Sequence, residues 1–468
     1  MSTRTACERS RQVTEGLDAK LKMVSPDTAF VDVGSGEHWV CIPESRCEQN
    51  VRQFGAFTCD LYAIREWLLE HHIKAVAMES TGVYWIGLFQ VLDDAGLDVC
   101  LVNARDLKTV KGRPKTDKLD CQWGQRLHSY GLLRPSFRPA KAICAIRSIW
   151  RMREQVVRDA GRCIQRMQKA MHEMNLLLPK VVTDITGKTG MAIIKAILAG
   201  ERNPAVLAKL RDPRVKRSES DIAKALDGNY RSEQLFLLDA NLRQYEFLVA
   251  QLSAYDAEIE RRLKEMPVLR PLSEPEHDVN NHAHKRDRDR NRNIPSFNAR
   301  SLAHELTGVD LAAVPGFSST LCLCTLFETG LDMSKWPTDK HFGSWLGLSP
   351  NPRISAGRDL GTHTKKCASR AARYFRCAAT SLTHSHCYLG DFYRRMRARH
   401  GGAHAITATA HKLAVLYYNL LKNGEQFRHI DQAAYREAIR ETQIRNLQKR
   451  AAKLGFALTP KAAGTHVA

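Results

Sequence analysis

Four acidic residues stand at positions where metal-dependent phosphate chemistry would need them. Asp32 interrupts the apolar run 29–33, where a carboxylate is costly unless it is paired or binds an ion. Glu79 ends a later apolar run, and Asp117 and Asp120 have the spacing that puts both on one face of a helix. Carboxylate oxygens are the ligands that Mg²⁺ and Mn²⁺ prefer, and such ions can polarise a scissile phosphate. We therefore predict that these acids bind Mg²⁺ or Mn²⁺.

An alternation of strands and helices must position these acids. A strand, a turn at Gly34–Gly36 and a second strand make a hairpin, and β-α-β alternation follows. Glu79 falls at the carboxyl end of its strand, where α/β sheets present ligands. The pattern predicts strands at 29–33, 38–42, 74–79 and 99–102, with helices near 58–72, near 83–95 and from about 117. This order with the four acids predicts an α/β domain with a ribonuclease H-like (RuvC-like) core over 28–140.

Composition points to a polyanionic partner. Lys and Arg total 71 against 50 Asp and Glu, a formal charge of +21 on 468 residues. Such an excess favours binding to phosphates, since neutralising them releases counterions. No apolar stretch is long enough to cross a membrane, the N-terminus has no apolar signal segment, and the 13 cysteines are scattered without C-x-x-C pairs. We expect a cytoplasmic protein with reduced cysteines that does not bind a membrane.

The middle of the chain has the apolar spacing of long helices. Apolar residues recur every three or four positions over 149–178, and again over 238–266 with one break at Asp256. These runs predict an antiparallel coiled coil or a dimerisation stalk over 141–270, although the amphipathic helices of a globular bundle fit about equally well. The other expected parts are a flexible N-terminus (1–27), a linker (271–304) that includes the mixed-charge run 284–292, a mainly α domain (305–440) and a basic tail (441–468).

The motifs of both halves resemble one family. The first half contains FVDVGSGEHWV, AMESTGVYW and KTDKLDC, which carry the four acids. The second half contains LAAVPGF, FGSWLGLSPNPRISAGRDLG and GDFYRRMRARHGGAHAITATAHKLA. From about Phe30 to Tyr435 the chain is similar to the DEDD transposases of bacterial insertion sequences of the 110/1111 type, which are bridge-RNA-guided recombinases.

The resemblance implies a mechanism and partners. It implies strand exchange between donor and target DNA through a covalent phosphoserine, a guide (bridge) RNA, and a homo-oligomer, a dimer or tetramer, in which the nuclease-like domain of one protomer meets the serine domain of another. It also implies a bacterial protein associated with the nucleoid. The family places its nucleophilic serine in a Ser-Gly-Gly context, at which this chain has Ser355, Ala356 and Gly357. The substitution at Ala356 reduces backbone freedom there.

Read without the family, Ser355 is a turn residue in a basic loop, and the resemblance makes it the candidate nucleophile. Nearby cations are candidates for holding DNA phosphates, namely Arg353, Arg358, Lys365 and Lys366.

Two other functions fit the same residues. A metal-dependent junction nuclease would use the four acids with water as the nucleophile. A non-catalytic nucleic-acid-binding protein would use only the basic surface, with Asp117 and Asp120 as helix-start or solvated charges and Glu79 as a strand-end ion pair.

Overall fold

The computed structural model describes residues 23–80, 82–107, 116–270, 293–365 and 369–459. These residues form two compact units, 1–138 and 139–468, and each is described by itself. No helix among the described residues is long and apolar enough to cross a membrane. Every cysteine that the structure describes is a free thiol.

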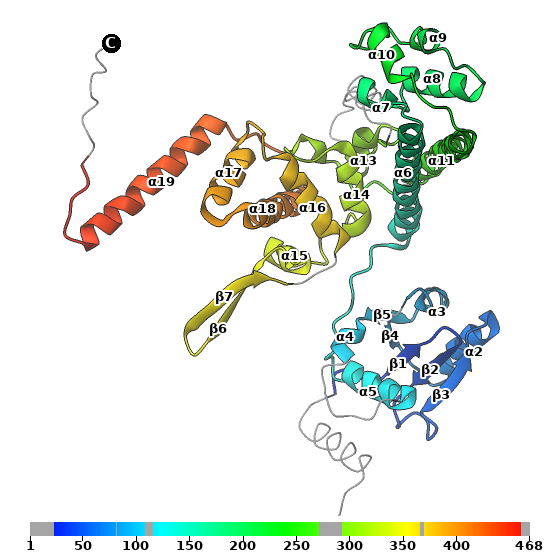
Figure 1. Cartoon of the computed structure of the whole chain (residues 1–468). Coiled ribbons are helices and arrows are strands. Elements are labelled where there is room, and N and C mark those ends of the chain that lie inside the picture. The colour runs from blue at the N-terminus through cyan, green and yellow to red at the C-terminus, as the bar shows by residue number, and fades with distance from the viewer. Residues whose placement is uncertain (1–22, 81, 108–115, 271–292, 366–368, 460–468) are drawn as a thin grey trace, which may run out of the picture. The chain divides into compact units, whose positions relative to one another are not determined.

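A five-stranded mixed sheet forms the centre of the first unit (Figure 1). The strands are β1 (Thr28–Val33), β2 (Glu37–Cys41), β3 (Val51–Gly55), β4 (Ala75–Glu79) and β5 (Asp98–Val102), in the order β3-β2-β1-β4-β5. The first three are antiparallel neighbours, and β4 and β5 continue the sheet in parallel with β1. The predicted strands are confirmed to within two residues at each end, and β3 was not predicted.

Helices cover both faces of this sheet (Figure 1). On one face, α2 (Thr58–Glu70) and α3 (Trp85–Asp94) bury leucine, isoleucine and aromatic side chains against the odd-numbered positions of β1. On the other face lies α5 (Asp117–Ser129), which packs through Cys121 on Phe30 and Ala77. A short helix, α4 (Ala104–Leu107), follows β5. The helices that the sequence predicted near 58–72, near 83–95 and from about 117 are therefore confirmed.

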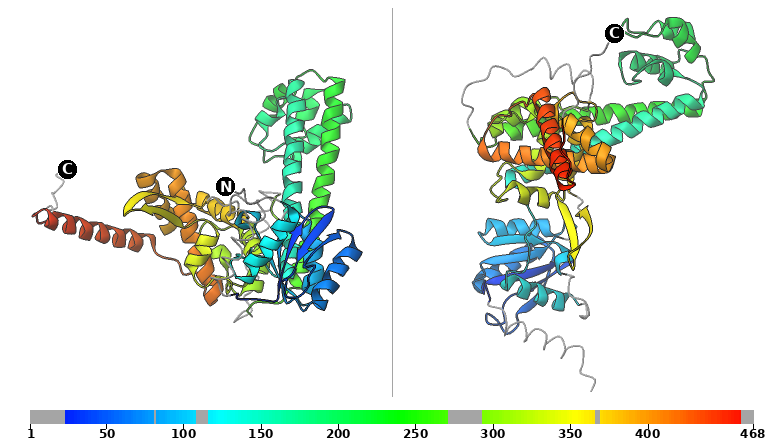
Figure 2. Two further views of the ribbon diagram at one scale, coloured as in Figure 1. Left: turned by 90° about the horizontal axis from the view of Figure 1, so that it is seen from below. Right: turned by 90° about the vertical axis from the view of Figure 1, so that its left-hand side faces the viewer.

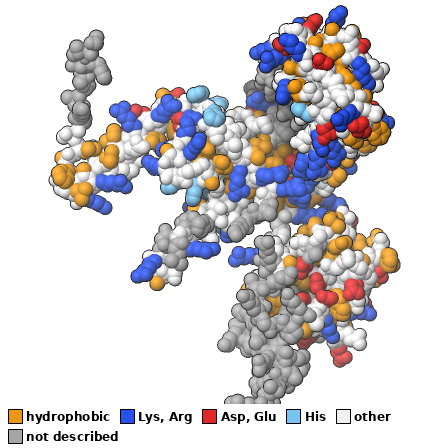
Figure 3. Space-filling model, viewed as in Figure 1, with side chains coloured by type: hydrophobic (Ala, Val, Ile, Leu, Met, Phe, Trp, Pro, Cys, Tyr) orange, Lys and Arg blue, Asp and Glu red, His pale blue; other side chains and the backbone are white. Residues whose placement is uncertain are grey.

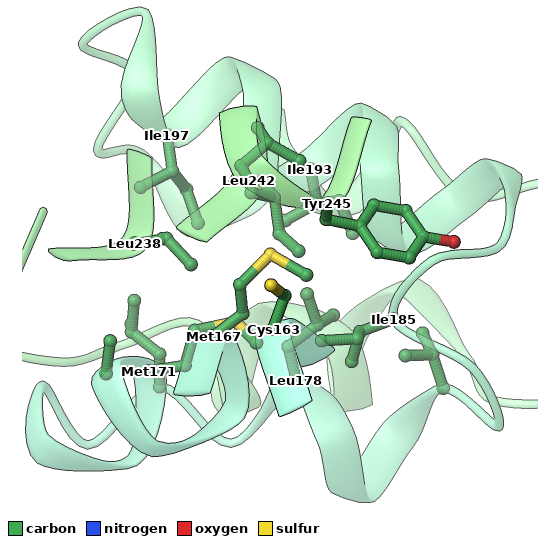
Figure 4. Packing of buried hydrophobic residues seen from close by; sticks show 14 of the residues in the cluster. Cys163, Met167, Met171, Leu178, Ile185, Ile193, Ile197, Leu238, Leu242 and Tyr245 are labelled. Atoms are coloured by element: carbon green, nitrogen blue, oxygen red, sulfur yellow. The ribbon is translucent and has the colours of Figure 1, made fainter. Parts of the chain in front are cut away.

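Two long antiparallel helices begin the second unit. They are α6 (Lys141–Glu173) and α11 (Ser232–Lys264), which lie side by side (Figures 1 and 2). Four short helices join them at one end, namely α7 (Leu178–Val181), α8 (Lys188–Leu198), α9 (Pro204–Ala208) and α10 (Glu219–Ala225). We call residues 141–264 the arm. Its core contains Met167, Met171, Leu238 and Leu242, packed against the short helices (Figure 4).

A buried ion pair explains the break in the second apolar run. Arg153 on α6 and Asp256 on α11 are 2% and 4% exposed and pair with each other. Arg153 also donates to the backbone oxygen of Asn293 (3.0 Å), and Asp256 accepts from the backbone amide of Ser296 (2.8 Å). Most of the predicted seam is buried, but Met152 and Val249 are 51% and 40% exposed, so their expected places in the seam are wrong.

The rest of the second unit is mainly helical and encloses an aromatic core. Its elements are α13 (Ala299–Thr307), the 3₁₀ helix η1 (Leu311–Ala313), α14 (Ser319–Thr329), α15 (Asp339–Trp345), β6 (Pro350–Ser355), β7 (Arg358–Thr364), α16 (Arg370–Ser381), α17 (Tyr388–His400), α18 (Gly402–Asn423) and α19 (Gln432–Lys453). Phe342 of α15 packs on Phe375 of α16 and Tyr417 of α18, with ring centroids 6.1 Å away in both cases. This core anchors α15, from which β6 and β7 extend.

Several expected boundaries differ from the elements that form. The amides of Val24 and Ser25 donate to the backbone oxygen of Ser129, so the end of the expected flexible terminus 1–27 is attached to the first unit. Helix α13 begins at Ala299, inside the expected linker 271–304, and residues 271–292 of that linker lie outside the described residues. Helix α19 crosses the boundary expected at 440.

Candidate active site: a carboxylate face and a serine hairpin

Asp32 and Glu79 lie next to each other on neighbouring strands. In the parallel pair β1–β4, Val31 is opposite Met78, and the two acids follow one residue later on each strand. Side chains alternate between the faces of a sheet. Asp32 comes two residues after Phe30 and Glu79 two residues after Ala77, so both acids belong to the face on which α5 packs. Each acid is half-buried.

Helix α5 brings the other two acids to the same face. Asp117 and Asp120 lie in its first turn, which is capped by the Thr116 hydroxyl accepting from the amide of Leu119 (3.3 Å). Asp117 is exposed and Asp120 is half-buried. The spacing predicted that both share one helical face, and the helix boundaries confirm it. Acids in the first turn also interact favourably with the helix dipole.

Close packing fixes α5 on β1. A Cβ atom added at Gly124 would lie 2.5 Å from the ring of Phe30, so only glycine lets the helix approach this closely. Gln125 donates to the backbone oxygen of Thr28 (3.2 Å), and Cys121 donates from its thiol to the backbone oxygens of Phe30 and Trp39 (3.2 and 3.1 Å). Burial raises the pKa of Cys121 well above its usual range, so this thiol stays neutral.

The strands and α5 bring the four carboxylates to one face of the sheet, but their side chains do not form a single cluster. Within the residues that the structure describes, no three His, Cys, Asp or Glu side chains are grouped so as to hold a metal ion. The donor set itself, four carboxylates, has the oxygen chemistry that suits Mg²⁺ or Mn²⁺. The structure thus brings together the elements that carry the four acids.

Two residues of this face were missed by the sequence analysis. Gly124 sits inside a helix, where glycine is unfavourable, and that is a signal of close packing that the sequence offers. Trp39 is paired with Asp32 across β1 and β2. Its indole Nε1 is buried and has no hydrogen-bond partner among the described residues. No sequence pattern distinguishes this tryptophan from one that only fills the core.

Ser355 lies at the end of a projecting β-hairpin in the second unit (Figure 1). It is the last residue of β6, is paired with Arg358 of β7, and is exposed like every other residue of β6. Between them, Ala356 and Gly357 have φ values of 48° and 74°. Two-residue hairpin turns of type I′ need positive φ at both central positions. Ala356 therefore occupies a conformation that favours glycine, as the sequence indicated.

The expected phosphate-binding cations lie along the same hairpin. Arg353 and Arg358 are exposed on β6 and β7, and Lys365 is exposed just after β7. Lys366 lies outside the described residues. A register shift near Pro352 and Ile354 indicates a bulge close to the end of the hairpin. Such bulges change the direction of side chains, here next to Ser355.

Two family models match the chain. One, described as a transposase and named for the DEDD transposases of IS110, covers residues 31–176. The other, described as the transposase IS116/IS110/IS902 family, covers residues 310–394. Both halves of the chain are thus similar to transposases of the IS110 family. The first match contains all four acids, and the second contains Ser355. No curated protein matches the chain.

Proposed function

We propose that this protein is a transposase of the IS110 family, an RNA-guided DNA recombinase that uses Ser355 as nucleophile and the four acids as ligands of Mg²⁺ or Mn²⁺. The observation that supports it best is the shared sheet face of Asp32, Glu79 and the start of α5. The strand order β3-β2-β1-β4-β5, antiparallel and then parallel, supports a ribonuclease H-like (RuvC-like) fold for the first unit.

The four acids would hold the ion through their carboxylate oxygens. A bound divalent ion polarises a phosphate and neutralises charge that develops on it. The protein holds Asp32 and Glu79 on neighbouring strands and fixes α5 through Gly124, and rotation of the four side chains would direct them to a common ion. Four carboxylates on one face repel one another, which favours binding of a cation between them.

Ser355 would carry the strand exchange. Its Oγ forms a bond to phosphorus, and the bond from that phosphorus to a bridging deoxyribose oxygen breaks. The serine proton leaves to solvent, and the released strand end takes up a proton to become a hydroxyl. The phosphoserine diester keeps the phosphate activated, so that the hydroxyl of another strand can reverse the step and join to it. Arg353 and Arg358 flank Ser355 in a position to hold neighbouring phosphates.

The partners we propose are donor DNA, target DNA and a guide (bridge) RNA. The net charge of +21 suits a protein that holds phosphate backbones. When base pairing selects the sequence, the protein need only read backbone and shape. We place the protein in the bacterial cytoplasm at the nucleoid, where these partners are found.

We also propose that the transposase is a homo-oligomer, a dimer or tetramer. Phe236 and Phe247 on α11 are 65% and 61% exposed. They are 11 residues apart, just over three full helical turns, and so lie on one face of the helix. Exposed aromatic side chains on one helical face are typical of protein interfaces. This face of the arm is the one we assign to a second protomer.

Trapping of the covalent intermediate tests the proposal. Full-length protein with its co-purified RNA is incubated with labelled DNA and Mg²⁺, and adducts are resolved on denaturing gels. We expect an adduct with the wild type and none with Ser355→Ala. Asp120→Asn should lose both adduct and cleavage, whereas Ser220→Ala, at an exposed serine of α10, should behave like the wild type. Normal cleavage by Ser355→Ala, without an adduct in the wild type, would identify a nuclease that uses water.

A further inference from the structure

The arm contains a large cavity at the end that carries its short helices. Its volume is about 1470 Å³. Its walls come from α6, from α11, from two loop segments, 180–189 and 212–217, and from Asn293 and Ile294. All of these residues belong to the second unit. The cavity is separate in sequence from both the carboxylate face and the serine hairpin.

Basic side chains line this cavity. Lys180, Lys188, Lys216 and Arg217 all contribute to its wall, and all four are exposed. Within the described part of the chain, no ion pair to any of these four is found. Lys and Arg side chains also gather over the arm on the face shown in Figure 3.

The acids of the same wall are already engaged. Asp212 pairs with Arg214 (3.0 Å), and this hydrogen bond lowers its pKa to about 2. Asp184 accepts from the amide and the hydroxyl of Thr186 (2.8 and 2.7 Å). Asp256 is held by the buried Arg153. Six basic and three acidic side chains line the cavity, so its wall carries an excess of three positive charges.

The two loops are held in place before any ligand arrives. The hydroxyl of Thr189 accepts from the amide of Asp212 (2.9 Å), which joins one loop to the other. Gly190 packs on the preceding loop so closely that an added Cβ would lie 2.2 Å from the backbone oxygen of Ile185. Thr186 and Thr189 are only 3% and 5% exposed. The cations thus project from a fixed frame, which lowers the entropic cost of binding.

We infer that this cavity binds the phosphodiester backbone of a single-stranded turn of nucleic acid. Cations around a concave wall suit an anion that can bend into it. A duplex is stiff over about 150 base pairs, whereas single-stranded loops and turns can follow such a surface. The aromatic ring in the wall, Tyr245, is only 6% exposed, so base stacking contributes little and binding is independent of sequence. RNA and DNA share this backbone chemistry.

Salt-dependent binding tests the inference. Fluorescence anisotropy measures the affinity of the full-length protein for labelled oligo(U) RNA and oligo(dT) DNA of about 20 nucleotides. The variant combines K180Q, K188Q, K216Q and R217Q. The slope of log K against log salt is negative, and each lost phosphate contact on a single strand reduces its magnitude by about 0.7. We expect the magnitude of the slope to decrease by about 3 and the affinity at low salt to fall at least tenfold.

A matched variant separates this site from general basicity. It combines R166Q, K169Q, K209Q and K224Q, which remove the same charge from exposed positions of the arm outside the cavity wall. We expect it to keep a slope within about one unit of the wild type. Equal losses in the two variants, or no change in the cavity variant, would overturn the inference.

Photo-cross-linking locates the bound strand and identifies its source. Strands with 4-thiouridine or 4-thiothymidine are cross-linked to the full-length protein, and the modified peptides are mapped. We expect cross-links within 180–189 and 212–217, and the strand that gives them, RNA or DNA, is the ligand. Cross-links confined to other segments would contradict the inference. None of these results depends on Ser355 or the four acids, so the site can fail while the proposed function stands.

Discussion

Asp32 lies on a strand whose flanking residues are buried, whereas Ser355 ends a strand whose six residues are all exposed. The carboxylate face is backed by an apolar core and covered by a helix that is hydrogen-bonded to β1. The serine hairpin has two strands and is anchored to the aromatic core through α15. The two groups that the proposed reaction needs are therefore held by different physical means.

This difference indicates which changes each group tolerates. Burial of the sheet holds the backbone of Asp32 and Glu79 in place, since a packed core resists changes of volume. A two-stranded hairpin alone is only marginally stable in water, so its shape depends on the turn at Ala356 and on whatever it contacts. We expect substitutions in the first unit to lower mainly the stability of the protein, and substitutions in the hairpin to lower mainly its activity.

Removal of the hairpin is the strongest test of this contrast. Replacing residues 351–363 by Gly-Gly joins Pro350 and Thr364, which are already paired. We expect adduct formation to vanish, because Ser355 is lost, and thermal unfolding to change little, because β6 buries no side chain. A large drop in the unfolding temperature would show that the hairpin supports the fold.

Gly124→Ala should lower stability and have little direct effect on Ser355. The added methyl group would lie 2.5 Å from the Phe30 ring, and overpacking of this kind costs about 1–3 kcal/mol. The unfolding midpoint in urea measures the loss. Gly161→Ala is the matched control, because this helical glycine has open space around it, and it should stabilise by up to about 1 kcal/mol. Phe30→Leu combined with Gly124→Ala should recover part of the loss.

A fall in pH should lower the stability of the five-stranded sheet and leave the serine hairpin unaffected. Burial lowers the pKa values of His38 and His128, so below about pH 6.5 the unfolded chain binds more protons than the folded one. Stability is therefore lost as the pH falls through this window, by at most about 1.4 kcal/mol per pH unit for each imidazole. Hydrogen exchange of β1 and β4 peptides, corrected for intrinsic rates, should show it.

His38→Phe is the variant that checks the cause. It should flatten the pH dependence of β1 exchange, whereas His172→Gln, at an exposed position of α6, should leave it unchanged. An unaltered pH profile in His38→Phe would assign the effect to other groups.

Ala356→Gly should give the smallest effect. A left-handed backbone costs a non-glycine residue about 1 kcal/mol, so the substitution removes this strain. Part of the stability gained is offset by the greater freedom of glycine in the unfolded chain. We expect adduct formation to be faster by up to about fivefold. Gly357→Ala, at φ 74°, should change the rate in the opposite direction, and equal rates in all three proteins would mean that the turn does not limit the reaction.

Much of the fold of the first unit could be predicted from the sequence. The apolar runs of β1, β4 and β5 and the spacing in α2 and α3 are strong local signals. Strand β3 was missed because its residues are exposed or half-buried, which leaves no alternation to read. The face shared by the four acids needed the pairing of β1 with β4, which is a tertiary property.

The arm shows a different limit of sequence patterns. Its helices were predicted, but Asp256 was read as a break in the apolar run, because the partner that buries it, Arg153, is 103 residues away in sequence. Ser355 could be singled out only through the family, because nothing local distinguishes it from an ordinary exposed turn serine. The basic cavity was not predicted, since its four cations come from two segments that only the fold brings together.

The Arg153–Asp256 pair fixes the register of the two long helices of the arm. Sliding α6 past α11 by even one turn would strand two charges in an apolar seam, which typically costs about 3–5 kcal/mol. With 33 residues at 1.5 Å each, either helix measures about 50 Å, and the pair keeps the two helices from sliding along each other. The short helices at one end of the arm are therefore held at a set distance from the opposite end.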